Sequence, residues 1–374
     1  MLIHNDKMSK PMQRKRIYFF IGTTAELIKV APIMKELKRR KITFKLIFSG
    51  QRRINFDEFR DYISVLKPSI SLSERGYSHS LIFFALWAIK ATFDGIFTLR
   101  KEFKGLKKSN SYFIIHGDTF TSFIGSVIAT FFNLKLVHVE SGALSFNLLE
   151  PFPEEMIKIA NIHLADVLFA PNNWAKNNLR NIKGTKIDTK QNTLIETFRW
   201  SMTNIKRASF KKYKNYYILL LHRQEHVVFK KTWSRKTLEF IIKNADPNLN
   251  CILIKHPLSI KVIKSLKLAP YQMRNVKIIS PLSYLDFMSL MHEAQFIATD
   301  SAFNQLESYL MGLPFLSLRN HIEQIEGLGN NVVIAKNNLF IIKSFLNNYQ
   351  KYRTKPLTYS SKPSKIIVDY LMNH

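Results

Sequence analysis

The chain has 374 residues, about two domains' worth by length, and its hydrophobic fraction of 46% allows each domain to bury a core. With 56 Lys and Arg residues against 27 Asp and Glu residues the formal net charge is +29, so an anionic partner is expected. The single cysteine, Cys251, excludes an internal disulfide and a cysteine-based metal site, and it indicates a reducing, cytosolic compartment.

The first half of the chain alternates short apolar strands with helical segments. Strands are predicted at 17–21, 44–50, 112–116 and 134–139, and helices at 26–40, 80–104 and 120–132. Such alternation is typical of a parallel, doubly wound sheet with helices on both faces. We therefore predict a first Rossmann-like lobe here.

Segment 184–200 interrupts this alternation and is interpreted as the connection between two lobes. A second series follows, with strands at 216–221, 251–255, 276–281, 296–300 and 314–318 and helices at 232–244, 284–294 and 303–311. Two such series predict an α/β protein with two Rossmann-like lobes, residues 1–186 and 187–357, facing a central cleft. A final helix in 358–374 is expected to be able to pack back on the first lobe.

Polar or ionisable side chains follow nearly every predicted strand. Because the carboxyl ends of parallel strands open into the ligand crevice, we expect these side chains to line the cleft. The first lobe supplies carboxylates at Asp118 and Glu140 and, in the loop PFPEE, Glu154 and Glu155. The second lobe supplies His222, Arg223, His256 and the Asp300-Ser301 turn before a helix.

This division of charge fits a nucleotide sugar. The free N–H groups and the dipole of the helix that follows Ser301 suit a diphosphate, and the carboxylates of the first lobe would face the sugar. Loss of a nucleoside diphosphate from the anomeric carbon builds positive charge on the ring, which carboxylates stabilise. Grouped carboxylates also raise each other's pKa, so one of them can carry a proton near neutral pH.

Each of these residues also has a simpler structural explanation. Asp118 can be a helix N-cap, His222 a core or capping histidine, and Glu26 a carboxylate that complements a helix dipole. His116 and His138 lie inside predicted strands and are expected to be packed rather than catalytic. The order of the residues along the chain is what favours a site.

In that order the motifs resemble those of the UDP-N-acetylglucosamine 2-epimerase family. The resemblance covers roughly residues 17–335 and rests on GTTAELIKVAP (22–32), HGDTFTS (116–122), HVESG (138–142), PFPEE (151–155), HRQE (222–225), KHP (255–257) and DSAFNQLE (300–307). It implies a GT-B-like fold and reversible inversion at C2 of a UDP-linked N-acetylhexosamine for surface polysaccharide synthesis. In the family this reaction runs by elimination of UDP to a glycal and re-addition, with neither cofactor nor metal.

Position by position, the resemblance implies four catalytic residues, Asp118, Glu140, Glu154 and His222. It also implies contacts with the nucleotide sugar from Lys29, Glu155, Lys158, Arg223, His256, Ser301, Ala302 and Glu307. A homodimer is a further expectation.

The chain departs from the family pattern at the positions that the resemblance assigns to phosphate binding. Family arginines are replaced at Thr24, at Ala143-Leu144, at Gln324 and, by lysine, at Lys158, and Phe303 replaces a glycine beside the phosphate turn. Arginine and lysine are not interchangeable at a bidentate site, so the nucleotide or the sugar is expected to differ.

Two hypotheses remain open. The retained carboxylates and histidine favour a sugar-nucleotide 2-epimerase. The high positive charge, the apolar stretch 81–97 and the altered phosphate turn favour a glycosyltransferase acting on a lipid-linked or polysaccharide acceptor. No nucleic-acid motif accompanies the dispersed basic residues, so binding of nucleic acid is not expected, whereas diffuse attraction to an anionic membrane surface is. A lysine-rich genome bias is the alternative explanation of the charge.

Overall fold

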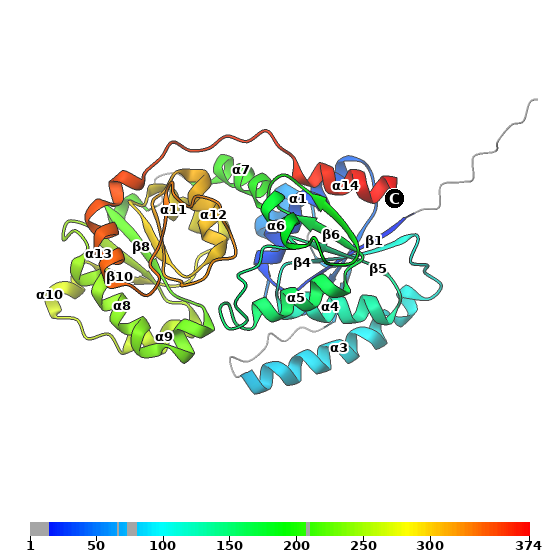
Figure 1. Cartoon of the computed structure of the whole chain (residues 1–374), viewed down its shortest axis with the longest axis horizontal. Coiled ribbons are helices and arrows are strands. Elements are labelled where there is room, and N and C mark those ends of the chain that lie inside the picture. Colours follow the sequence, from blue (N-terminus) through cyan, green and yellow to red (C-terminus); the bar gives the residue numbers. More distant parts are fainter. Residues whose placement is uncertain (1–14, 66, 73–80, 207–209) are drawn as a thin grey trace, which may run out of the picture.

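The computed structural model describes residues 15–65, 67–72, 81–206 and 210–374 as two lobes, each built on a parallel sheet (Figure 1). The prediction of a GT-B-like α/β fold with two Rossmann-like lobes is confirmed. The basic residues before Lys15 lie outside the described residues, and so does the beginning of the predicted helix 80–104.

The N-terminal lobe contains a seven-stranded sheet in the order β3-β2-β1-β4-β5-β6-β7, with all pairs parallel. Its strands are β1 (Arg16–Ile21), β2 (Lys45–Phe48), β3 (Ile70–Ser71), β4 (Ser111–His116), β5 (Lys135–Val139), β6 (Val167–Ala170) and β7 (Thr185–Asp188). Its helices are α1 (Thr24–Arg39), α2 (Arg60–Ile63), α3 (Leu81–Phe103), α4 (Phe120–Phe131), α5 (Glu154–Leu164), α6 (Asn173–Asn178) and α7 (Leu194–Asn204). The central strands are buried on both faces, as near-continuous apolar runs require.

The C-terminal lobe contains a six-stranded parallel sheet in the order β10-β9-β8-β11-β12-β13. Its strands are β8 (Tyr216–Leu220), β9 (Asn250–Ile254), β10 (Val276–Ile279), β11 (Ile297–Thr299), β12 (Phe315–Ser317) and β13 (Val332–Ile334). Its helices are α8 (Lys231–Asn244), α9 (Ile260–Lys264), α10 (Pro270–Met273), α11 (Tyr284–Glu293), α12 (Ala302–Met311) and α13 (Leu339–Asn348). Strand order reverses beside β8 and β11, whose carboxyl ends therefore open into a crevice.

The chain crosses between the lobes twice. After α13 it runs back along the molecule to α14 (Pro363–Asn373), which packs against α1 (Figure 1). Arg40 and Asp369 form an ion pair of 2.7 Å there, and Lys15 donates to the carbonyls of Leu371 and Met372 at 2.9 Å. The C-terminal segment therefore belongs physically to the N-terminal lobe.

An aromatic stack joins the two lobes beside this crossing. Trp200 of α7 lies 4.7 Å from Tyr62 and 5.7 Å from Phe59, between ring centroids, and Phe59 stacks on Tyr284 of α11 at 6.0 Å. The rings bury apolar area on both sides of the junction. They fix where the lobes meet and leave the cleft at the strand ends.

None of the helices in the described ranges combines the length and the hydropathy that a membrane span needs.

Candidate active site

A cleft of about 950 Å³ lies between the lobes at the carboxyl ends of the strands. Ten of the twelve residues that the family resemblance implied line it: Lys29, Asp118, Glu140, Glu154, Lys158, His222, Arg223, His256, Ser301 and Ala302. The cleft is lined from both lobes, so closing it would bring the carboxylate wall against the histidine wall.

Backbone geometry aims two of the carboxylates into the cleft. After β4 the chain turns at Gly117, which has φ of +63°, and Thr119 caps α4 by accepting a hydrogen bond from Ser122 N at 3.0 Å. Asp118 is therefore free of the capping role that its sequence position allowed. Glu140 follows β5 with φ of +67°, a conformation that non-glycine residues adopt at a cost and that recurs at functional sites.

Glu140 is held by polar groups on every side. Lys29 Nζ lies 2.5 Å from one of its carboxylate oxygens, His116 Nε2 lies 2.9 Å from the same oxygen, and Asn192 Nδ2 donates to the other at 2.8 Å. Burial would raise the pKa of Glu140, but Lys29 and His116 outweigh burial and lower it below the usual range. The structure therefore keeps Glu140 ionised.

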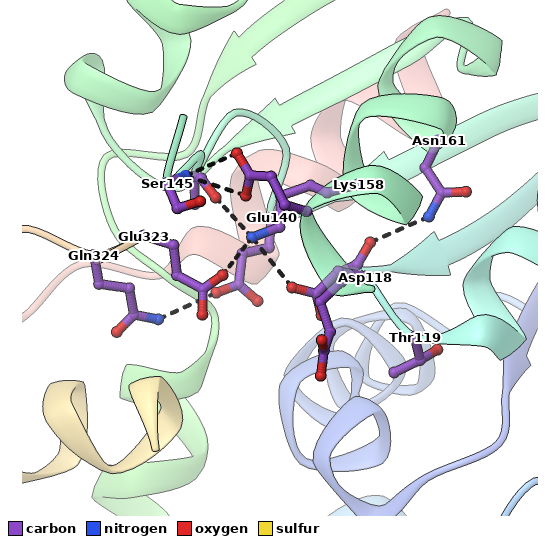
Figure 2. A network of polar contacts seen from close by, with 12 residues as sticks. Asp118, Thr119, Glu140, Ser145, Lys158, Asn161, Glu323 and Gln324 are labelled. Carbon is purple, nitrogen blue, oxygen red and sulfur yellow. Dashed lines mark hydrogen bonds and ion pairs between the residues drawn. The ribbon is translucent and has the colours of Figure 1, made fainter. Parts of the chain in front are cut away.

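Asp118 belongs to a buried ionic network that spans the lobes (Figure 2). Lys158 Nζ lies 3.1 Å from Asp118 and 2.8 Å from Glu323 of the second lobe. Arg223 and Arg319 each lie 3.1 Å from Glu323. Burial opposes ionisation of Glu323, but Lys158, Arg319 and Arg223 outweigh it and hold its pKa well below the ordinary value. Glu323 is therefore a fixed negative charge in the lining of the cleft.

Glu154 differs from the other carboxylates in its environment. It begins α5, lies 3.2 Å from Arg223 Nη1, and has its other oxygen, Oε2, buried without a hydrogen-bond partner among the described residues. Burial raises the pKa of Glu154 to about 7, although Arg223 opposes the shift. This carboxyl is suited to gain or lose a proton near neutral pH.

The opposite wall carries His222 on a buried aspartate. His222 Nδ1 lies 2.9 Å from Asp300 Oδ1, and Asp300 also accepts from the backbone N–H groups of His222 and Arg223. The ring of His256 lies 5.5 Å from that of His222. An aspartate on Nδ1 leaves the other ring nitrogen of His222 available to a substrate.

The N-terminus of α12 forms the anion-binding part of the cleft. Ser301 is its N-cap and accepts a hydrogen bond from Asn304 N at 3.4 Å. Ser301 and Ala302 line the cleft, so the N–H groups at the start of the helix, which have no partner within the helix, lie at the cleft. Phe303 stands beside them with Lys29 Nζ 5.3 Å from its ring, a contact between the lobes. The phenylalanine therefore narrows the cleft next to the helix end.

Two implied contact residues lie outside the cleft lining. Glu155 accepts hydrogen bonds from the backbone N–H groups of Ser145 and Phe146, at 2.9 Å and 3.0 Å, and so shapes the loop before α5. Glu307 is completely buried, receives Asn304 Nδ2 at 2.8 Å, and has a pKa raised to about 7 by burial. The segment PFPEE is also not wholly a loop, because Glu154 and Glu155 form the first turn of α5.

Several residues that complete the site were not predicted from the sequence. His116, expected to be packed, contacts Glu140 and lines the cleft, whereas His138 is packed and bonds Gly117 O at 2.7 Å. Glu323 and Arg319 had no strand or helix signal to place them, since they lie in the loop after β12. Asn192 lies in segment 184–200, which was interpreted as the connection between the two lobes.

Comparison with known proteins identifies the family of this site. The model of the UDP-N-acetylglucosamine 2-epimerase family matches residues 35–363. UDP-N-acetylglucosamine 2-epimerases of Methanocaldococcus jannaschii and Methanococcus maripaludis are 28% and 29% identical, over 88% and 84% of this chain and 91% and 86% of theirs. The crystal structure of the Neisseria meningitidis UDP-GlcNAc 2-epimerase bound to UDP-GlcNAc is 26% identical, with a TM-score of 0.81, and covers 96% of this chain and all of that one. The chain belongs to the UDP-N-acetylglucosamine 2-epimerase family.

Proposed function

We propose that the chain is a 2-epimerase of a UDP-linked N-acetylhexosamine. The observation that carries this function is the placement of Asp118, Glu140 and Glu154 on one wall of the cleft, opposite His222 and the N-terminus of α12. The family whose model matches is one of isomerases, which favours epimerisation over glycosyl transfer.

The environments of the carboxylates separate their proposed roles. Glu140 is held ionised by Lys29 and His116, so it stabilises positive charge on the sugar ring as UDP departs. Glu154, with a pKa raised to about 7 by burial, carries the C2 proton. Asp118 lies on the same wall, where Lys158 fixes its position. A proton that originates from solvent then adds to the other face of C2, and re-addition of UDP at the anomeric carbon completes the inversion.

The diphosphate is proposed to lie at the N-terminus of α12. The N–H groups after Ser301, together with Lys29, Arg223 and His222, would receive its oxygens. These groups would replace the arginines that the sequence lacks.

NMR spectroscopy of UDP-GlcNAc incubated with the protein in D₂O tests this function. We expect UDP-ManNAc to appear and deuterium to replace hydrogen at C2 in both sugars, because elimination removes that hydrogen and re-addition takes one from solvent. Free sugar with UDP would instead indicate hydrolysis. Absence of any reaction until an acceptor is added would establish the glycosyltransferase and overturn the epimerase.

An exposed apolar surface on the N-terminal lobe supports the proposal of a homodimer. α3 and α4 pack side by side along the lower edge of the view (Figure 1). Both helices carry large apolar side chains that are exposed to solvent. These are Leu86, Ile89, Phe93, Phe97, Phe123 and Phe131, between 37% and 72% exposed. Because α4 carries no charged residue, this apolar surface is proposed to pair with a second copy in a homodimer.

Association with a membrane is proposed on separate grounds. The net charge of +29 attracts anionic lipid diffusely, without a defined docking site. Such attraction would hold the enzyme near lipid-linked acceptors of its product.

Sedimentation and vesicle flotation separate these two associations. Phe93→Asp is expected to convert a dimer to a monomer, because it buries a charge in an apolar interface. The matched control is Phe340→Asp, which alters an exposed phenylalanine on the other lobe and is expected to leave the dimer intact. Both variants are expected to bind anionic vesicles like the wild type at low salt and to release them at high salt. A monomeric wild type contradicts the dimer, and failure to bind at low salt contradicts membrane association.

A further inference from the structure

A buried histidine that the proposed chemistry does not use lies behind His222. His226 occupies the π-helical turn Glu225–Phe229 that follows β8, and its side chain is fully buried. Its Nδ1 hydrogen-bonds Asp300 Oδ2 at 3.1 Å, and its Nε2 lies 3.8 Å from Glu150 Oε1. A fully buried imidazole between two carboxylates is costly to place unless it is charged.

The two carboxylates belong to different lobes. Asp300 directly follows β11 in the C-terminal lobe and contacts His222 with its other oxygen. Glu150 belongs to the N-terminal lobe and lies in the loop just before α5, the helix that begins with Glu154. It also accepts from Asn320 N at 2.8 Å and lies 3.3 Å from Lys230 Nζ, both on the opposite lobe. A line of contacts between the two lobes thus runs from Glu150 through His226 and Asp300 to His222.

We propose that His226 is a positioning residue whose imidazolium bridges the lobes. On one side it holds Asp300, which contacts His222, and on the other side it holds Glu150, which lies four residues before Glu154 in the chain. One group then sets the position of a residue on each wall of the cleft. The inference rests on the proposed function for its effect on rate, but the bridge itself is a property of the fold.

Other charged groups near His226 do not provide the same link. Glu225 adds negative charge from the same turn, Lys230 pairs with Glu150, and His256 contacts the ring of His222. Burial alone would lower the pKa of His226, but Asp300 and Glu150 outweigh it and raise the pKa to about 9. Since the raised pKa belongs to the folded state, the bridge is present below that pH and is lost as the pH rises through about 9.

Titration of the His226 ring by NMR tests the bridge without reference to activity. In the wild type we expect a charged ring at pH 7. In Glu150→Gln we expect the midpoint to fall, because one of the two carboxylates that favour the charged ring has become neutral. A neutral ring at pH 7, or a midpoint that Glu150→Gln leaves unchanged, overturns the proposal even if the protein proves to be no epimerase.

Kinetics test the positioning role. His226→Gln is expected to lower kcat by about 100-fold with a much smaller change in KM, because a misplaced histidine and carboxyl slow chemistry more than binding. The alkaline limb of the wild-type kcat profile is expected to disappear in that variant and to move to lower pH in Glu150→Gln. If His226→Gln does not fold, the pH profile of kcat in Glu150→Gln tests the proposal alone, because a merely structural role of His226 would not shift the alkaline limb of that profile. If the alkaline limb of the kcat profile in Glu150→Gln lies at the same pH as in the wild type, the proposal is contradicted.

Discussion

Asp118→Asn and Glu140→Gln are each expected to lower kcat for epimerisation by about 100-fold or more, with the protein still folded and still binding UDP. Each change removes one negative charge from the cleft wall that is proposed to face the sugar, and it keeps the size of the side chain. Charge stabilisation and proton transfer each contribute factors of this size. The rate of UDP-ManNAc formation, followed by NMR, measures the loss.

The matched control is Asp188→Asn. Asp188 ends β7, a strand of the same sheet, but its carboxylate pairs with Lys190 and does not line the cleft. We expect it to retain the wild-type rate. Full activity in both Asp118→Asn and Glu140→Gln would show that the carboxylate wall is not the catalytic one.

Lys158→Met is expected to lower the free energy of unfolding by about 3–5 kcal/mol, because it leaves a buried carboxylate without its nearest cation. Lys158 is 3% exposed and lies between Asp118 and Glu323, which come from different lobes (Figure 2). Binding of the nucleotide sugar is expected to weaken as well, since Lys158 lines the cleft and its ion pairs join the two lobes there. Urea unfolding and a KM measurement check the two effects.

Lys158→Arg provides the comparison for that variant. It keeps the positive charge and adds donors that can reach both carboxylates, so we expect stability close to that of the wild type. Lys351 is exposed, so Lys351→Met serves as a reference for the loss of a surface lysine. If Lys158→Met lowers the free energy of unfolding no more than Lys351→Met does, a structural role for the buried network is contradicted.

Those parts of the fold with strong local signals could be predicted from sequence. Five strands are near-continuous apolar runs: β1, β4, β5, β8 and β9. Most of the residues predicted to line the cleft were identified from the carboxyl ends of such strands. β3 and β7 were not predicted, because β3 has two residues and β7 reads TKID, with a single apolar side chain. β6, with the short run VLFA, was passed over beside the loop before it.

The buried ion network was beyond sequence reasoning for another reason. Lys158 and Glu323 are 165 residues apart, and Arg223 and Glu323 are 100 apart. Neither spacing carries a periodic signal, and Glu323 lies on a loop, where burial cannot be read from neighbouring residues. The sequence therefore named Lys158 and Arg223 as contacts of the nucleotide sugar but could not predict their ion pairs with Glu323.

The packing of α14 on α1 also bears on how the chain is made. During synthesis the N-terminal lobe emerges from the ribosome first, and domains usually begin to fold in that order. Here one side of α1 stays uncovered until Pro363–Asn373 has been translated, after the whole C-terminal lobe. The nascent N-terminal lobe thus exposes an apolar helix face for most of translation. Chaperone binding to ribosome-bound chains is expected to persist until α14 has left the exit tunnel.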